Sequence, residues 1–165
     1  MISTRAFFAH PSSMPYDDIW DACIDIRDFI ASKQGADTSD HIRVVSGRED
    51  FEKNAHGDWD AWQTGIVTRK DFMTGKPVYD LFIATGDTCG KATAAILKMA
   101  LLENKAVFKW AENSLERIGD VIVEDPEDWA NGYRLAPFEI IDLLHPSVPC
   151  DEEALGQLEL FEVRS

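Results

Sequence analysis

The stretch VYDLFIATGDTCGKATAAILKMALLENKAVFKW, residues 78–110, decides the fold class of this chain. Its apolar run at 78–84 has the length and the aromatic and β-branched content of a buried strand. A loop with two glycines follows at 85–90, and the composition of residues 91–103 favours a helix. The run at 106–110 predicts another strand. This order of strand, helix and strand is typical of a parallel sheet covered by helices.

The residues that precede this stretch repeat the same order of elements. Residues 4–9 and 42–45 predict two short strands, and a helix is expected between them from Asp17 or Asp18 to about residue 32. The apolar residues of this helix recur at intervals of four, three and four, which places them on one face: Ile19, Cys23, Ile26 and Ile30.

The rest of the chain completes the predicted architecture. A helix is expected over residues 58–72, and residues 121–123 suggest one more strand. We therefore predict an α/β fold, a three-layer Rossmann-like domain with a mostly parallel sheet of four or five strands. This domain is assigned to residues 1–144, and residues 145–165 are expected to form an acidic surface tail. The side chains expected to pack from the 58–72 helix are Trp59, Trp62, Ile66 and Phe72.

The composition limits the classes of partner. Of 165 residues, 16 are Lys or Arg and 30 are Asp or Glu, which gives a net charge of −14 without any basic run. We therefore do not expect direct binding to duplex DNA. The charge either keeps the protein soluble or imitates DNA phosphates, and both interpretations stay open. No stretch has the roughly 20 apolar residues of a membrane span.

Cysteine and histidine usage points to a reducing compartment and argues against a metal site. The three cysteines are widely spaced and form neither a CxxC pair nor a zinc pattern with the four histidines. We expect a cytoplasmic protein that has no metal, no cofactor and no membrane partner. The oligomeric state stays open, a homo-oligomer included.

Three loops are expected to meet at one edge of the sheet. Ligands of open α/β sheets bind beyond the carboxyl ends of the strands. This rule brings together residues 10–16, 46–50 and 85–91, and it makes His10 a candidate for contact with a ligand.

The 85–91 loop fails as an ATPase P-loop but suits an anion. The spacing from Gly86 to Gly90 is one residue too short, and Ala92 stands where a magnesium-binding Ser or Thr is needed. Backbone N–H groups at a helix N-terminus nevertheless attract anions, and glycine allows close approach. We predict that Gly86, Thr88, Gly90 and Lys91 bind a phosphate or a ribose. The alternative is that the glycines only permit a tight turn.

Three segments carry a resemblance to a known family: AFFAHP at 6–11, IVTRKDFMTGKPVYDLFIATGD at 66–87, and GKATAAILKMALLENKAVFKW at 90–110. In layout they resemble the nucleoside 2-deoxyribosyltransferase family and its relatives. The matching positions are Asp71, the strand from Asp80, Gly90, and Lys105 before its valine strand. The resemblance implies a Rossmann-like domain that binds a nucleoside or nucleotide in bacterial or phage nucleotide or DNA metabolism.

The resemblance also implies cleavage or transfer of an N-glycosidic bond, for which the family uses a glutamate near the start of the helix after the glycine turn. Residues 91–98 of this chain contain no carboxylate. Asp87 on the loop, Asp17 near the first strand and Glu49 near the second are the alternative catalytic candidates. TIR domains, some of which cleave NAD, are a second resemblance, but no glutamate stands at the matching place.

The tail contains the sharpest short motif of the chain. The run Gln157-Leu158-Glu159-Leu160-Phe161 resembles the Gln-Leu-x-Leu-Phe peptide by which bacterial replication and repair proteins bind the DNA polymerase sliding clamp. In such a peptide Leu160 and Phe161 fill an apolar pocket, Leu158 adds contact and Gln157 forms hydrogen bonds. The motif suggests an alternative function, a non-enzymatic adaptor or inhibitor that docks on the clamp. The alternation of leucines also fits an edge strand.

Overall fold

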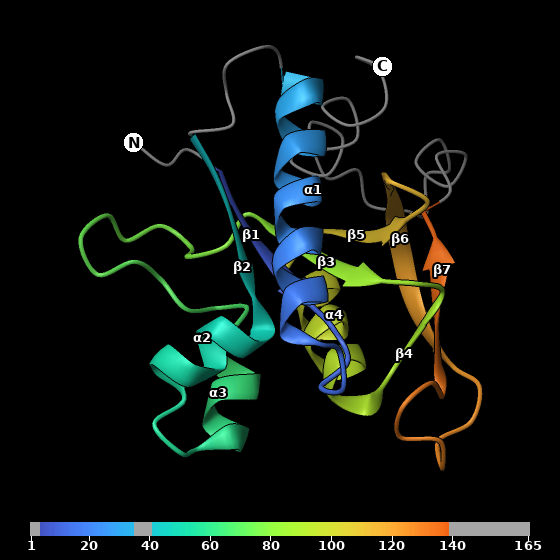
Figure 1. Cartoon of the computed structure of the whole chain (residues 1–165). Coiled ribbons are helices and arrows are strands. Elements are labelled where there is room, and N and C mark those ends of the chain that lie inside the picture. The colour runs from blue at the N-terminus through green and yellow to red at the C-terminus, as the bar shows by residue number, and fades with distance from the viewer. Residues whose placement is uncertain (1–3, 35–40, 139–165) are drawn as a thin grey trace, which may run out of the picture.

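The computed structural model describes residues 4–34 and 41–138, which form a three-layer α/β domain (Figure 1). The predicted fold class is therefore confirmed. The elements in chain order are β1 (Thr4–Ala9), α1 (Tyr16–Gln34), β2 (Ile42–Ser46), α2 (Gly47–Asn54), α3 (Trp59–Gly65), β3 (Leu81–Thr85), β4 (Thr88–Cys89), α4 (Lys91–Leu102), β5 (Ala106–Ala111), β6 (Ser114–Val123) and β7 (Tyr133–Pro137).

One sheet of seven strands runs through the domain in the order β2-β1-β3-β5-β6-β7-β4. The first four strands are parallel, and β6, β7 and β4 extend the sheet in antiparallel pairing. The sheet is thus wider than the four or five strands predicted. The additional strands β4 and β7 have two and five residues. β4 is too short to produce a strand pattern in the sequence, and β7 is a short segment that ends at Pro137.

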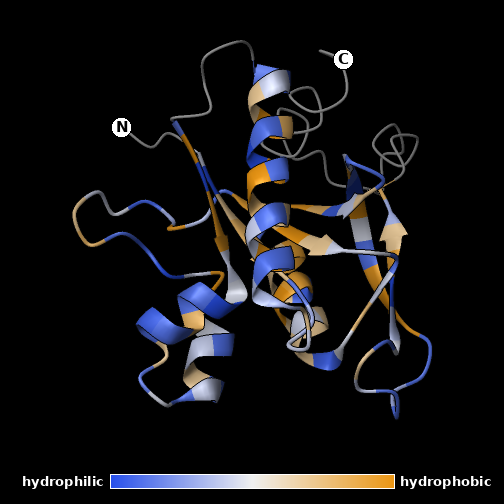
Figure 2. Ribbon diagram, viewed as in Figure 1, coloured by the Kyte–Doolittle hydropathy of each residue, from blue (hydrophilic) through white to orange (hydrophobic). Residues whose placement is uncertain are grey.

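Side-chain alternation along the parallel strands divides the core into two halves. Ala6 and Phe8 of β1 face the same half as Ile26 and Ile30 of α1. Phe7 of β1 faces the other half, which contains Trp62 of α3 and Ala94, Ile96 and Leu97 of α4. Helix α1 therefore covers one face of the sheet, and α2, α3 and α4 lie on the other. Figure 2 shows hydrophobic and hydrophilic residues alternating along α1, as in an amphipathic helix, whereas α2 is mostly hydrophilic. Strands buried on both faces explain why their sequences are continuously apolar.

The helix predicted over residues 58–72 is wrong in its second half. Helix α3 ends at Gly65, and a long loop with an internal hairpin leads from there to β3. Phe72, which was expected to pack in the core, is 97% exposed at the tip of this loop. Helix α2 was not predicted, because its sequence GREDFEKN is almost entirely polar and buries little apolar surface.

Among the described residues, no helix is both long and apolar enough to cross a membrane. The last residues of the predicted domain, 139–144, and the whole tail 145–165, with its clamp-type motif, lie outside the described residues.

Candidate ligand-binding cleft

A cleft of about 970 Å³ opens beyond the carboxyl ends of β1 and β3. The chain leaves β1 through α1, on one face of the sheet, to reach β2, and it returns to β3 through α2 and α3, on the other face. These two connections diverge between the neighbouring strands β1 and β3, which is the topological switch point of the sheet. All three predicted loops contribute to the lining, with residues 10–13, 47–48 and 88–91 among them.

Aromatic side chains form one wall of the cleft. Phe51 of α2 lies against Trp59 and Trp62 of α3, with ring centroids 5.2–5.3 Å apart. Trp62 is buried, whereas Trp59 is 45% exposed and presents ring surface to solvent. Trp129, from the loop before β7, is 67% exposed and also lines the cleft. Planar apolar ligands therefore have aromatic surface available on two separate segments.

The N-terminus of α4 and the segment 129–131 meet in the same cleft. The Lys91 N–H donates to the Trp129 carbonyl at 3.0 Å, and the Lys91 Nζ lies 4.3 Å from the Trp129 ring centroid. The Thr88 hydroxyl donates to Asn131 Oδ1 at 3.2 Å. Gly90 is the N-cap residue and provides no side-chain hydrogen bond to the first turn of α4. The positive end of this helix thus faces the cleft beside the Lys91 ammonium group.

His10 is held as a neutral imidazole at the end of β1. Its Nδ1–H donates to the Pro11 carbonyl at 3.0 Å, and its Nε2 accepts the Arg48 N–H at 3.3 Å. Burial lowers the pKa of His10 and the nearby Arg48 charge adds to this effect, while the bond to Pro11 partly offsets it. Because both ring nitrogens are engaged, His10 orients the start of α2 and offers its ring to a ligand.

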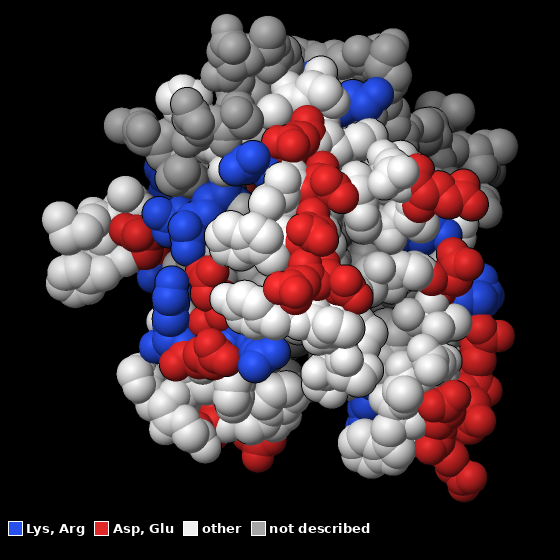
Figure 3. Space-filling model, in the orientation of Figure 1, with Lys and Arg blue, Asp and Glu red and all other residues white. Residues whose placement is uncertain are grey.

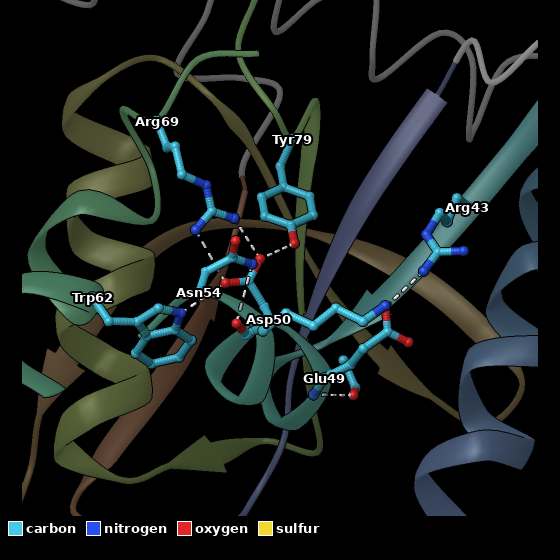
Figure 4. A network of polar contacts seen from close by, with 9 residues as sticks. Arg43, Glu49, Asp50, Asn54, Trp62, Arg69 and Tyr79 are labelled. Carbon is cyan, nitrogen blue, oxygen red and sulfur yellow. Dashed lines mark hydrogen bonds and ion pairs between the residues drawn. The ribbon is translucent and has the colours of Figure 1, made fainter. Parts of the chain in front are cut away.

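A buried carboxylate, Asp50, forms a hydrogen bond with the aromatic wall at Trp62 (Figure 4). Asp50 of α2, 2% exposed, accepts the Trp62 Nε1–H at 2.7 Å. It also accepts two Arg69 N–H groups at 3.2 and 2.5 Å and the Tyr79 hydroxyl. Burial by itself raises the pKa of Asp50, but the bonds from Arg69, Tyr79 and Trp62 outweigh it and hold this pKa below its ordinary value. Asp50 therefore stays ionised and ties α2, α3 and the 66–80 loop together.

Four of the predicted ligand-binding residues line the cleft: His10, Thr88, Gly90 and Lys91. Gly86 lies outside the lining, in a turn with φ +80° that favours glycine. This turn is the tight-turn alternative considered for the loop. The tight-turn alternative thus fits Gly86, whereas Gly90 lines the cleft and its contact with a ligand stays a prediction.

The three candidate catalytic carboxylates lie outside the cleft lining. Asp87 pairs with Lys109 of β5 at 2.6 Å, and this hydrogen bond and charge lower the pKa of Asp87. Asp17 is exposed in the first turn of α1. Glu49 pairs with Arg43 at 2.6 Å and Lys53 at 3.3 Å.

Among the described residues that line the cleft, the carboxylates are Glu52 and Asp60. Sequence reasoning missed Glu52 because α2 was not predicted, and Asp60 because nothing indicated which face of its helix meets the cleft. The signal that could have found Glu52 is the pattern Ser46-x-x-Glu49, a helix start in which the Glu49 N–H donates to the Ser46 hydroxyl. Comparison with protein-family models, curated proteins and solved structures finds no match to this chain.

Proposed function

We propose that this protein binds a nucleoside or nucleotide in the cleft at the switch point, in bacterial or phage nucleotide or DNA metabolism. The observation that carries the proposal is the meeting, in one cleft, of exposed indole rings with a helix N-terminus that has no side-chain cap. A base has the size and planarity to stack on Trp129 or Trp59. A phosphate matches the α4 N-terminus and Lys91.

Cleavage or transfer of the N-glycosidic bond extends the same proposal. Such chemistry needs a carboxylate beside the sugar to stabilise an oxocarbenium-like transition state. Of the described residues, the carboxylates that line the cleft are Glu52 and Asp60, and Glu52 forms an exposed pair with Arg48 at 3.2 Å. The assay is release of free base from nucleosides and nucleoside monophosphates. Hydrolysis that is abolished in Glu52→Gln or Asp60→Asn assigns the role, and hydrolysis that survives in both variants excludes these two residues.

Lys91→Glu tests the phosphate position. We expect this change to weaken binding of nucleoside 5′-monophosphates about tenfold or more, because one charge-assisted contact is lost and repulsion replaces it. Binding of the matching nucleosides should change by less than about twofold. Isothermal titration calorimetry with both ligand series measures the difference. Lys98→Glu, later on the same helix and paired with Asp120 at 3.5 Å, is the matched control. Equal losses for nucleosides and monophosphates would contradict the phosphate position.

Docking on a replication clamp is the second candidate function, and the Gln157–Phe161 motif favours it. We expect the full chain to bind a bacterial sliding clamp at micromolar affinity or better. The double change Leu160→Ala/Phe161→Ala should abolish this binding, since these two side chains supply most of the apolar contact. Surface plasmon resonance on immobilised clamp measures it. Equal binding of wild type and variant, or no binding by either, would exclude this motif as the docking peptide.

A further inference from the structure

A basic pocket of about 350 Å³ lies on the side of α2 away from the cleft. Its lining includes five cationic side chains and one exposed aromatic ring: Arg5, Arg43, Lys53, Arg69, Lys70 and Phe72. These residues come from β1, the edge strand β2, α2 and the loop before β3. Figure 3 shows the blue side chains gathered beside α2 and β2, apart from the red row that follows α1. The fold thus concentrates positive charge that is scattered along a sequence of net charge −14.

The carboxylates of this basic pocket are largely neutralised within the protein. Three carboxylates line it with the five cations: Glu49, Asp50 and Asp71. Asp50 is 2% exposed and bound by Arg69, and Glu49 is shared by Arg43 and Lys53. Asp71 is charged as well, since hydrogen bonds from Thr74 and Met73 and the nearby Arg5 charge lower its pKa. Five cations therefore face three carboxylates in the lining, which leaves an excess of positive charge. An anionic partner meets a local excess of positive charge here.

Phe72, the aromatic residue at the rim, lies at the tip of a hydrogen-bonded hairpin. The Val78 N–H donates to the Arg69 carbonyl at 2.9 Å and the Asp71 N–H to the Lys76 carbonyl at 2.7 Å. At the tip, Asp71 Oδ1 accepts the N–H groups of Met73 and Thr74 at 2.9 and 3.0 Å. Phe72 is consequently 97% exposed and Met73 86% exposed, beside Lys70. An exposed aromatic ring on a hydrogen-bonded hairpin, beside cationic side chains, has the parts of a stacking platform.

We propose that the basic pocket and Phe72 form a binding site for single-stranded nucleic acid. Phosphates of the strand contact Arg5, Lys70 and the neighbouring cations, and an unstacked base lies on the Phe72 ring. A duplex, with its bases already stacked, cannot use the ring, so the single strand is the partner that matches both features. This site is separate from the proposed nucleoside cleft and does not depend on it.

The test is fluorescence anisotropy of a short fluorescein-labelled oligodeoxythymidine titrated with the full chain. We expect saturable binding that weakens about tenfold between about 50 and 200 mM salt, the dependence for two or three phosphate contacts. Phe72→Ala and Lys70→Glu should each weaken binding about tenfold, while Phe72→Trp should retain it. The matched controls are Val123→Ala, an exposed apolar residue on β6, and Lys98→Glu on α4, and both should bind like the wild type.

Three results would overturn the proposal. The first is absence of binding at low salt, and the second is binding that Phe72→Ala leaves unchanged. The third is equal competition by polyglutamate, which would make the surface a general site for acidic polymers. Circular dichroism of each variant shows whether the fold is retained. Ligand binding at the cleft is tested separately with Lys91→Glu and involves other residues. Refutation of single-strand binding at the basic pocket therefore leaves the proposed function of the cleft unaffected, and the reverse also holds.

Discussion

Replacing Asp50 by Ala is expected to lower the free energy of unfolding by about 3 kcal/mol, the low end of the range for breaking a buried ion pair. The Asp50 side chain is 1% exposed and its partner Arg69 is 29% exposed. The change leaves the Trp62 indole N–H and the Tyr79 hydroxyl without their acceptor inside the core. The α2–α3 wall should loosen, and ligand binding in the cleft should weaken with it.

Urea unfolding followed by circular dichroism and tryptophan fluorescence measures this effect. Glu52→Ala is the matched control, because Glu52 lies two residues later on the same helix and forms only an exposed pair with Arg48. This control should change the free energy of unfolding by less than about 0.5 kcal/mol. Equal stability of the Asp50→Ala variant and the wild type would show that the network does not contribute to the fold.

The contribution of Asp50 should disappear in acid. Hydrogen bonds hold the pKa of Asp50 below its ordinary value of about 3.9, so the folded state favours the ionised form. A carboxyl with a depressed pKa contributes stability above its unfolded pKa and loses it as the pH falls through the folded pKa. The stability difference between wild type and Asp50→Ala should be constant above about pH 5 and shrink below about pH 4. A difference that grows on acidification would contradict this assignment.

Gly90→Ala is expected to disrupt the cleft itself. A Cβ at this position would lie 2.5 Å from the Trp129 carbonyl oxygen and 3.3 Å from that of Ala130. Both are backbone atoms, so the 129–131 segment must move away from the start of α4. We expect a loss of about 2 kcal/mol in stability, typical of overpacking, and at least about tenfold weaker ligand binding. Thermal unfolding and calorimetric titration measure the two effects.

The backbone of Gly90, with φ −82° and ψ 175°, is open to any residue, so only the contact with Trp129 opposes alanine. Gly65→Ala provides the comparison, because no atom lies within 4 Å of the added Cβ at the end of α3. This control should be neutral or slightly stabilising, since alanine favours the helix. A Gly90→Ala protein with unchanged stability and ligand binding would refute the role given to the 129–131 segment.

The buried elements were predictable from the sequence, whereas the polar ones were not. Strands β1, β3 and β5 are apolar on both faces, and α1 carries a continuous apolar stripe. Burial of this kind leaves a periodic signal. Helix α2 lacks that signal, because it is fixed by the Asp50 network and by a Ser46 cap. The short strand β4 forms by pairing with β7, and β7 pairs along its length with β6.

The cleft could be anticipated only in part. The rule that ligands bind beyond the carboxyl ends of parallel strands predicted that the loops after β1, β2 and β3 meet. Four residues selected from these loops line the cleft: His10, Thr88, Gly90 and Lys91. The contact of the 129–131 segment with the start of α4, from Trp129 to Lys91, joins residues 38 apart in the chain and has no sequence signal. Asp87 pairs instead with Lys109 of β5, a contact between separate elements that spacing in the sequence cannot reveal.

By itself, the sequence determined the α/β class, the parallel core and the edge at which loops converge, because apolar periodicity and strand order are local properties. Only the tertiary structure decided which carboxylates line the cleft and where positive charge gathers. Ion pairs such as Asp50–Arg69 and the grouping of Arg5 with Lys70 depend on distances across the fold. Those distances are set by how the elements pack and not by their spacing in the chain.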